Sequence, residues 1–168
     1  MKMDVFLPEG LSGFVAGIAS DLDFATRQLK RHLKDLTPEQ LTMVPDGLSN
    51  SIATIVVHMA GSEVYFAYSL LGKKVPDEHK TTFLMGQGDD GLLRPALGET
   101  VESLTAKLDQ ARAMLLESLV ALADTNLDEE LPWGKEAKAT RRFYLSLLPY
   151  HFSSHTGQIQ MVRKLVTR

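Results

Sequence analysis

The sequence contains no cysteine among its 168 residues, so it has no disulfide, no thiolate metal ligand and no cysteine nucleophile. Any metal site must therefore use nitrogen or oxygen ligands. A chain of this length buries roughly 70% of its unfolded surface and needs no covalent cross-link to be stable. We expect a single domain over residues 1–168.

Long apolar runs and an excess of positive charge are also missing. No stretch supplies the roughly 20 consecutive apolar residues that a membrane-spanning helix requires. The 18 Lys and Arg residues are balanced by 21 Asp and Glu residues, which does not indicate a nucleic-acid-binding surface. The amino-terminal apolar segment is interrupted by Pro8 and is too short for a signal peptide. These absences predict a cytoplasmic protein that binds neither membranes nor nucleic acids.

Several motifs of metal and catalytic sites are absent as well. The sequence has no Glu-x-x-His of the kind that di-iron bundles use, and no His-Glu-x-x-His of zinc proteases. It also lacks the Gly-x-Ser-x-Gly nucleophile elbow and a glycine-rich phosphate-binding loop. These classes of active site are therefore excluded.

Apolar residues recur every three or four positions over four long stretches, which predicts amphipathic helices. We expect these helices at about residues 12–36, 50–72, 100–123 and 140–166, with Ser49 or Asn50 as the cap of the second. No stretch alternates strictly enough to predict a β-sheet. The predicted fold class is all-α, a four-helix bundle with long connections.

Local signals add detail between and within these helices. The sequence Thr-Pro-Glu-Gln at residues 37–40 combines an N-cap, a proline at the first helical position and a capping box, so it predicts one extra short helix. A connection as long as residues 73–98 is usually functional or partly helical. Pro149 is expected to kink or restart the last helix. Gly157 would let a neighbouring helix approach closely.

Three histidines are candidates for a metal site. His151 and His155 stand four residues apart, so on a helix their Cβ atoms lie roughly 5–6 Å apart on one face. At that separation both rings can bind one metal ion at about 2.0–2.1 Å. His58 lies in a helix that is apolar nearly all round, so we expect it to be buried and either hydrogen-bonded or bound to metal. The pattern predicts a three-histidine metal site across two facing helices.

The remaining conspicuous side chains are expected to play other roles. His32 and His79 stand among charged residues, so we expect both to be exposed to solvent. Glu63 lies about 140° around the helix from His58, which favours a surface group or a support of the site rather than a metal ligand. Trp133, the only tryptophan, lies in a loop and is expected to cover the core.

Three neutral imidazoles leave a divalent ion with at least one open position, as in catalytic zinc sites. Such an ion lowers the pKa of bound water to about 7, or holds a bound thiol as a thiolate. Either would provide a nucleophile at neutral pH. Zinc, nickel and iron are all acceptable for nitrogen ligands.

The segment 50–63, together with the pattern HxxxHxGQI at 151–159, resembles the DinB/YfiT-like superfamily, and the likeness extends over nearly the whole chain. The resemblance implies a four-helix bundle, often a homodimer, that binds zinc or nickel through His58, His151 and His155. It also implies a metal-dependent transferase or isomerase that uses a low-molecular-weight thiol such as bacillithiol or mycothiol.

Three functions remain open on this basis. The first is a thiol S-transferase whose small electrophile occupies a pocket lined by aromatic residues such as Tyr65, Tyr150 and Trp133. The second is a metal-dependent hydrolase that uses metal-bound hydroxide. The third is a non-enzymatic dimer that binds a metal or a small ligand, although the charged outer faces of the first and third helices offer no apolar seam for a dimer. Three serines are the polar groups expected nearest to the metal: Ser51, Ser62 and Ser154.

Overall fold

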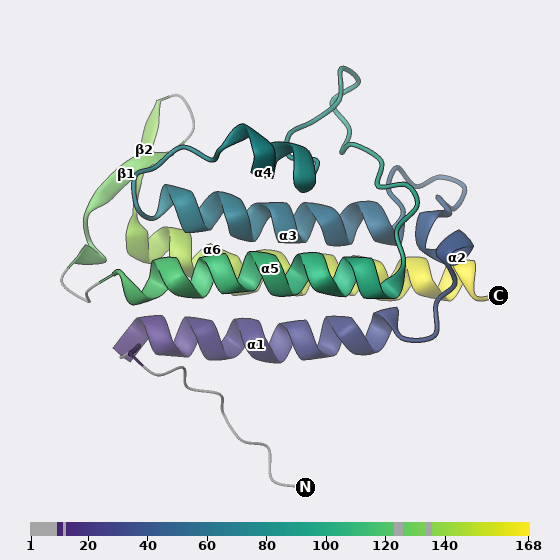
Figure 1. Ribbon diagram of the computed structural model, residues 1–168, viewed down its shortest axis with the longest axis horizontal. Coiled ribbons are helices and arrows are strands. Elements are labelled where there is room, and N and C mark those ends of the chain that lie inside the picture. The colour runs from purple at the N-terminus through teal and green to yellow at the C-terminus, as the bar shows by residue number, and fades with distance from the viewer. Residues whose placement is uncertain (1–9, 12, 123–125, 134–135) are drawn as a thin grey trace, which may run out of the picture.

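The computed structural model describes residues 10–11, 13–122, 126–133 and 136–168. Its helices are α1 (Gly13–Leu33), α2 (Pro38–Thr42), α3 (Ile52–Ser69), α4 (Asp77–Thr82), α5 (Val101–Val120) and α6 (Arg141–Val166). The four long helices α1, α3, α5 and α6 lie side by side as a bundle (Figure 1), which confirms the predicted fold class. Ser12, where the first helix was expected to begin, lies outside the described residues.

Helices α1 and α6 run in the same direction. Near their carboxyl ends, Nη1 of Arg163 on α6 donates to the backbone oxygen of Lys34, just after α1, at 2.9 Å. Near their amino ends, the guanidinium of Arg142 lies 5.2 Å from the centre of the Phe14 ring. The α3 helix runs the other way, because its last turns reach the beginning of α6, where Phe66 contacts Tyr144.

Helices α3 and α5 are also parallel to each other, so the chain between them must return along the full length of the bundle. Residues 70–100 make this return, and α4 lies within it, over α3 (Figure 1). The return ends where the backbone N–H of Ala96 donates to buried Thr54 Oγ1, near the start of α3, at 3.2 Å. The long connection is therefore partly helical, and the parallel direction of α3 and α5 explains its length.

The capping signals mark the start of α2 correctly and miss the cap of α3 by one or two residues. In the capping box of α2, Thr37 Oγ1 accepts from the backbone N–H of Gln40 at 3.3 Å, and Gln40 Oε1 accepts from that of Thr37 at 3.0 Å. The α3 helix is capped by Ser51, one or two residues later than expected. The 26-residue α6 helix runs without interruption through Pro149, so the predicted restart is wrong.

A small antiparallel sheet precedes α6, so the prediction of no sheet is wrong. Strand β1 (Glu130–Trp133) pairs with β2 (Ala137–Thr140), with Glu130 opposite Thr140. Strands of four residues, one of them containing a proline, are too short to show an alternating pattern. Arg141 anchors this hairpin, because its Nε donates to the backbone oxygen of Leu70 at 2.8 Å and its guanidinium pairs with Glu129.

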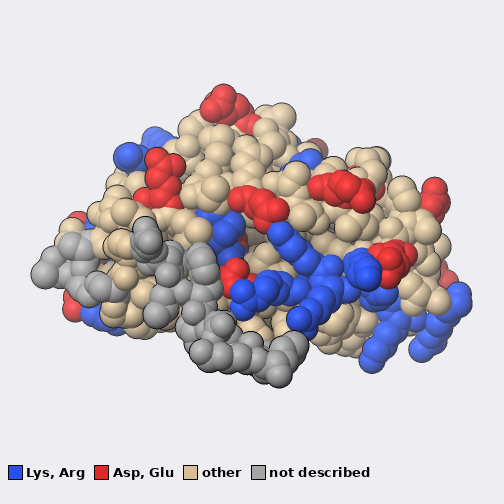
Figure 2. Space-filling view, turned by 60° about the horizontal axis from the view of Figure 1, so that its bottom comes forward, with Lys and Arg blue, Asp and Glu red and all other residues tan. Residues whose placement is uncertain are grey.

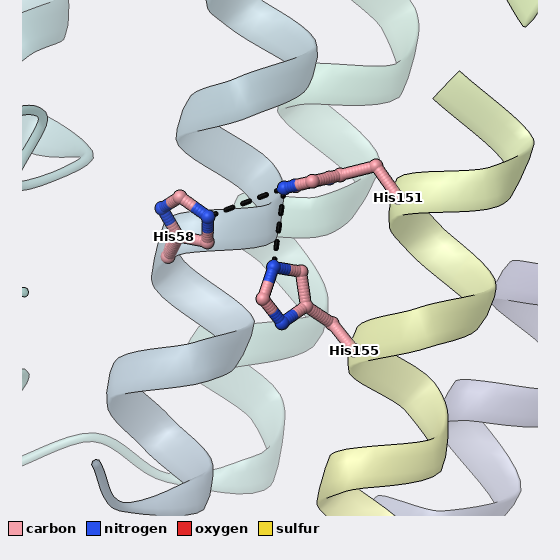
Figure 3. A group of neighbouring side chains, drawn as sticks. All are labelled: His58, His151 and His155. Carbon is pink, nitrogen blue, oxygen red and sulfur yellow. Dashed lines mark hydrogen bonds between the residues drawn. The ribbon is translucent and has the colours of Figure 1, made fainter. Parts of the chain in front are cut away.

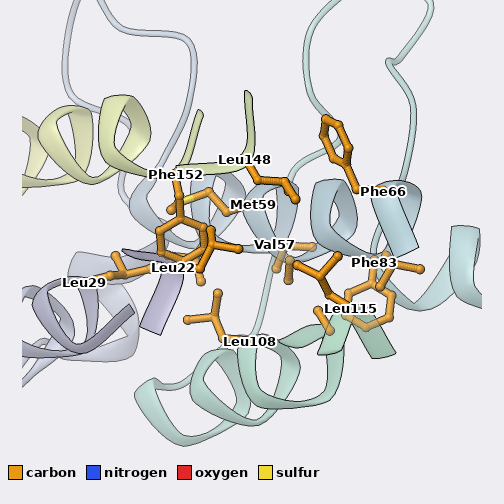
Figure 4. Packing of buried hydrophobic residues seen from close by; sticks show 14 of the residues in the cluster. Leu22, Leu29, Val57, Met59, Phe66, Phe83, Leu108, Leu115, Leu148 and Phe152 are labelled. Atoms are coloured by element: carbon orange, nitrogen blue, oxygen red, sulfur yellow. The ribbon is translucent and has the colours of Figure 1, made fainter. Parts of the chain in front are cut away.

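The bundle has one continuous hydrophobic core, to which all four long helices contribute (Figure 4). Leu22, Val57, Leu108 and Phe152 represent α1, α3, α5 and α6 in it. The α3 helix is central and contacts α2, α4, α5 and α6, which is consistent with a sequence that is apolar nearly all round. Among the described helices, none combines the length and hydrophobicity needed to cross a membrane.

Candidate metal centre

The three predicted histidines face one another across two helices. His58 extends from α3, and His151 and His155 extend from α6 (Figure 3). The Nε2 atom of His151 lies 3.2 Å from Nε2 of His58 and 3.1 Å from Nε2 of His155. Within the described part of the chain, these three form a group that could hold a metal ion, with their nitrogen atoms all within 4.8 Å of one another.

The spacing and chemistry of these nitrogens fit a shared cation. Two imidazole nitrogens that bind one tetrahedral ion at about 2.0–2.1 Å lie roughly 3.3 Å apart. A neutral imidazole carries one N–H and one lone pair, so each Nε2 is either a donor or an acceptor, and the donor in each of the two contacts of His151 depends on the tautomers. A divalent ion between the rings would accept all three lone pairs at once.

Partial burial keeps the rings of His58 and His151 in the neutral form that binds metal. Burial, with further contributions from His155 and His58, lowers the pKa of His151 to about 4. Burial and the neighbouring His155 also lower the pKa of His58 from its usual value. Both rings are therefore neutral at pH 7, and a metal ion would not have to displace protons from them.

A glutamine orients one of the three rings. Oε1 of Gln158 lies 2.7 Å from Nδ1 of His155. When that amide oxygen accepts from Nδ1–H, the lone pair of His155 is placed on Nε2, the atom that faces His151. Sequence reasoning assigned Gln158 no role, although residues three apart on a helix are neighbours and this spacing could have identified it.

The three serines named from the sequence occupy different positions relative to the site. Ser62 Oγ donates to the backbone oxygen of His58 at 2.9 Å, which uses its proton within α3. Ser51 caps α3 and accepts from the backbone N–H of Thr54. Ser154 is exposed on α6. Their observed hydrogen bonds therefore support α3 rather than the histidine rings.

The expectation that His79 and His32 are solvent-exposed is wrong. The side chain of His79 is only 16% exposed, because α4 folds onto α3 and places the ring between Tyr68 and Phe83. His32 is half-buried where α6 meets the end of α1, and its Nε2 accepts from Nε2 of Gln160 at 2.6 Å. Neither histidine belongs to the cluster of three.

Glu63 is also not a surface group. Its side chain is 2% exposed and accepts from Arg112 at 2.5 and 3.0 Å. Arg112 donates to Thr26 Oγ1 at 2.8 Å as well, so these side chains connect α3, α5 and α1. Burial raises the pKa of the Glu63 carboxyl, and the attraction of Arg112 offsets part of that rise. Glu63 thus stabilises helix packing on a side of α3 away from His58.

His151 also lines an open hollow of about 600 Å³. Its other lining residues are mainly aromatic: Tyr65, Phe66, Trp133, Leu147 and Tyr150. The three aromatic residues expected around a substrate are therefore brought together beside the histidines. Trp133 also packs edge-on against buried Tyr144 at 5.1 Å between ring centres, so it covers the core as expected and lines the hollow too.

These features define a class of helical-bundle protein with three histidines from two facing helices at the edge of an aromatic hollow. The sequence matches the DinB superfamily over residues 21–159, and the chain belongs to that superfamily. The crystal structure of a "conserved protein of locus" from Enterococcus faecalis is similar in fold, with a TM-score of 0.77 and 16% identity over 94% of this chain and 99% of that one. A search of curated protein sequences gives no significant match.

Proposed function

We propose that His58, His151 and His155 hold a divalent metal ion and that the protein is a metal-dependent transferase acting on a low-molecular-weight thiol. The observation that carries this proposal is the convergence of three Nε2 atoms beside the aromatic hollow. Zinc and nickel suit three imidazole ligands, and iron is compatible with them. A divalent ion in this site would hold a thiol as its thiolate at neutral pH.

The protein's own side chains supply binding and orientation. Tyr65, Tyr150 and Trp133 offer aromatic surface to an apolar electrophile, which the hollow holds beside His151. In the transfer, sulfur forms a bond to the electrophilic carbon while the leaving group departs with the bonding electrons and the thiol proton passes to solvent. Bacillithiol and mycothiol are the thiols that the DinB resemblance suggests.

The test is a turnover assay with a chromogenic aryl halide, run with and without thiol on protein loaded with zinc, nickel or iron. We expect turnover that requires both metal and thiol and is abolished in His155→Ala. His32→Gln is the matched control, because it removes a half-buried histidine outside the cluster and should leave turnover unchanged.

Other results would favour the other functions. Metal-dependent cleavage of an activated ester without added thiol would indicate a hydrolase. Stoichiometric metal binding without either reaction would indicate a metal- or ligand-binding protein.

A further inference from the structure

A second hollow, here called the lysine cleft, lies between the end of α3, the segment that carries α4, and strand β1, whose hairpin stands beside this end of α3 (Figure 1). Its volume is about 510 Å³, which is in the range of small-molecule sites. Its apolar lining residues are Tyr65, Val75, Met85, Leu131, Pro132 and Tyr144. Three lysines also line it: Lys73, Lys74 and Lys80.

The lysine cleft has an apolar floor and a positively charged mouth. Val75, Leu131 and Tyr144 are buried, whereas all three lysines are exposed. No Asp or Glu belongs to the described lining. An apolar interior with a few polar groups of one kind is typical of a ligand site.

The turn after α3 fixes the backbone that carries two of these lysines. Gly72 has a φ of 66°, and the backbone N–H of Lys73 donates to the backbone oxygen of Tyr68 at 2.9 Å. This is the Schellman ending of a helix, in which a glycine takes the left-handed conformation. The backbone of Lys73 is therefore held in place while its side chain is not.

The charges of two of the lysines are not neutralised by the protein. Within the described part of the chain, the side chains of Lys73 and Lys74 form no ion pair and no hydrogen bond. Lys80 pairs with Asp77 at 2.7 Å, so its charge is partly offset. Lys73 and Lys74 are therefore the cations available to a ligand.

Capping of α3 does not account for these two lysines. A lysine near the end of a helix often donates to the last carbonyl oxygens. At the end of α3 those oxygens already have donors, because Ser69 accepts from the backbone N–H of Gly72 at 2.9 Å and Leu70 accepts from Nε of Arg141 at 2.8 Å. The lysine side chains are therefore not required by the helix.

The larger basic surface of the protein lacks such a cleft and is balanced by acidic groups. Figure 2 shows Lys and Arg side chains gathered over α1, with Asp and Glu side chains among them. There Arg27 pairs with Asp23, and Lys30 pairs with Asp109. Ion pairs of this kind are usual on a solvated surface and do not indicate a ligand.

The hollow of about 600 Å³ between α1 and α6 also differs from the lysine cleft. Its described lining includes Asp21 and no lysine or arginine. A Cβ built on Gly157 in that lining would meet nothing within 4 Å, so the close helix neighbour expected for this glycine is not found in the described part of the chain. The positive charge and the apolar floor coincide in the lysine cleft.

We propose that the lysine cleft binds a small organic anion. Its apolar body lies against the floor, and its carboxylate or phosphate group lies between the ammonium groups of Lys73 and Lys74. Burial of the body supplies the hydrophobic part of the affinity. Attraction to the two lysines adds to it, because charges at the mouth of an apolar hollow are less screened than charges in bulk water.

The lysine cleft adjoins the aromatic hollow beside the histidines. Tyr65 lines both, so one side chain forms a wall between them. Ser69, at the cleft, follows His58 by eleven residues on α3, which is about 16 Å along the helix axis. An anion elongated enough to cover this distance would reach from the lysines to the histidines. Its role as a substrate rests on the proposed function, whereas the anion site itself does not.

Three probes of similar shape test the site: 2-naphthoate, 2-naphthyl phosphate and the neutral 2-naphthamide. Equilibrium dialysis uses metal-free protein, because a metal at the histidines would itself attract an anion. We expect at least one of the two anions to bind about tenfold or more tightly than the amide. The tighter anion identifies the group that the lysines accept. Equal binding of both anions and the amide would overturn the proposal.

Variants locate the bound anion. Lys73→Gln with Lys74→Gln should lower the affinity for the anion to that for the amide and leave the amide unchanged. Lys34→Gln with Lys164→Gln is the matched control, since it removes the same charge from exposed positions outside the cleft and should change neither affinity. An equal loss in both double variants would show a general charge effect and overturn the site.

Two further variants separate the cleft from the histidines. Ser69→Trp places an indole in the cleft and should weaken binding of all three probes. His155→Ala should bind them as wild type does, because no histidine of the cluster except through Tyr65 adjoins the cleft. Anion binding that is lost in His155→Ala and retained in Ser69→Trp would place the anion at the histidines and refute the lysine cleft. Absence of thiol-transfer turnover would contradict only the proposed function.

Discussion

The Oε1 atom of Gln158 lies 2.7 Å from Nδ1 of His155, on the side of the ring away from the nitrogen that faces His151. This contact determines which nitrogen carries the proton, and it limits rotation of a ring that is only partly buried. A metal ion would then meet a ring whose lone pair is already oriented. The contact also lies within one turn of α6, so it does not depend on how the helices pack.

Gln158→Leu should therefore weaken metal binding without removing a ligand. We expect the affinity to fall by about 10–100-fold, as for the loss of other partners of ligating histidines. Gln158→Glu retains an acceptor oxygen and should bind metal as wild type does or more tightly. Competition with a chromogenic chelator measures all three affinities. If leucine and glutamine gave the same affinity, the orienting role would be refuted.

Metal binding should stabilise the fold, because an ion held by α3 and α6 binds the folded chain and not the unfolded one. At a free concentration one hundred times the dissociation constant, the ion adds about 2.7 kcal/mol to the free energy of unfolding. Chelation should therefore lower the melting temperature, and added metal should restore it. The melting temperature of His155→Ala should be the same with and without chelator. Chelator-insensitive melting of wild type, after confirmed metal loading, would contradict the proposed site.

The helices were predictable because their signals are local. Apolar periodicity located the four long helices, and the capping box at Thr37 located α2. The histidine cluster was predictable in part, since His151 and His155 share a face of one helix. That His58 would meet them also required α3 and α6 to pack together, which the apolar character of α3 suggested without determining its rotation.

Other features depend on contacts between distant segments. Neither helix sequence indicates that α3 and α5 run in the same direction. The need for residues 70–100 to return along the bundle could therefore not be predicted. The charged neighbours of His79 in the sequence favour an exposed ring, but α4 folds back onto α3 and the ring is half-buried against Tyr68. The partner of Glu63 could not be identified from the sequence, because Arg112 is 49 residues away. Without a known partner, the sequence favoured a position at the surface or in support of the site. The hairpin strands are too short for periodicity to be visible.

Metal-free protein should lose stability as the pH falls from about 6.5 toward 4. The pKa of His151 is about 4 in the folded chain, against 6.5 for an unperturbed histidine, so between these values the unfolded chain binds more protons. The free energy of unfolding therefore rises with pH across this window. The part of it that His151 contributes is lost as the pH falls through the same window. His58 acts in the same direction.

Urea unfolding in the presence of chelator at pH 4.5, 5.5 and 7 measures this dependence. Carboxyl groups also make the free energy of unfolding depend on pH. The contribution of His151 is therefore measured as the difference in this pH dependence between wild type and His151→Leu. We expect the variant to show a shallower pH dependence over the window, because it cannot take up the proton. Identical slopes would mean that His151 is not held neutral by the fold.

The ion pair between Glu63 and Arg112 should matter far more to stability than the surface pairs do. Both side chains are largely removed from water, with exposures of 2% and 12%. The Lys30–Asp109 pair is much more exposed, at 33% and 60%. Solvent screens an exposed pair, whereas a buried charge that loses its partner keeps the cost of its desolvation.

Arg112→Met should therefore destabilise the protein by about 3–5 kcal/mol at pH 7, because Glu63 would remain buried without a counter-charge. Lys30→Met should cost no more than about 1 kcal/mol. Adding Glu63→Leu to Arg112→Met should recover much of the loss, since both buried charges are then gone. The loss of stability in Arg112→Met should be smaller at low pH than at pH 7, because burial raises the pKa of Glu63 and its protonated form needs no partner. Urea unfolding of the four proteins at pH 5 and 7 measures these differences, and equal costs for Arg112→Met and Lys30→Met would show that burial does not govern this pair.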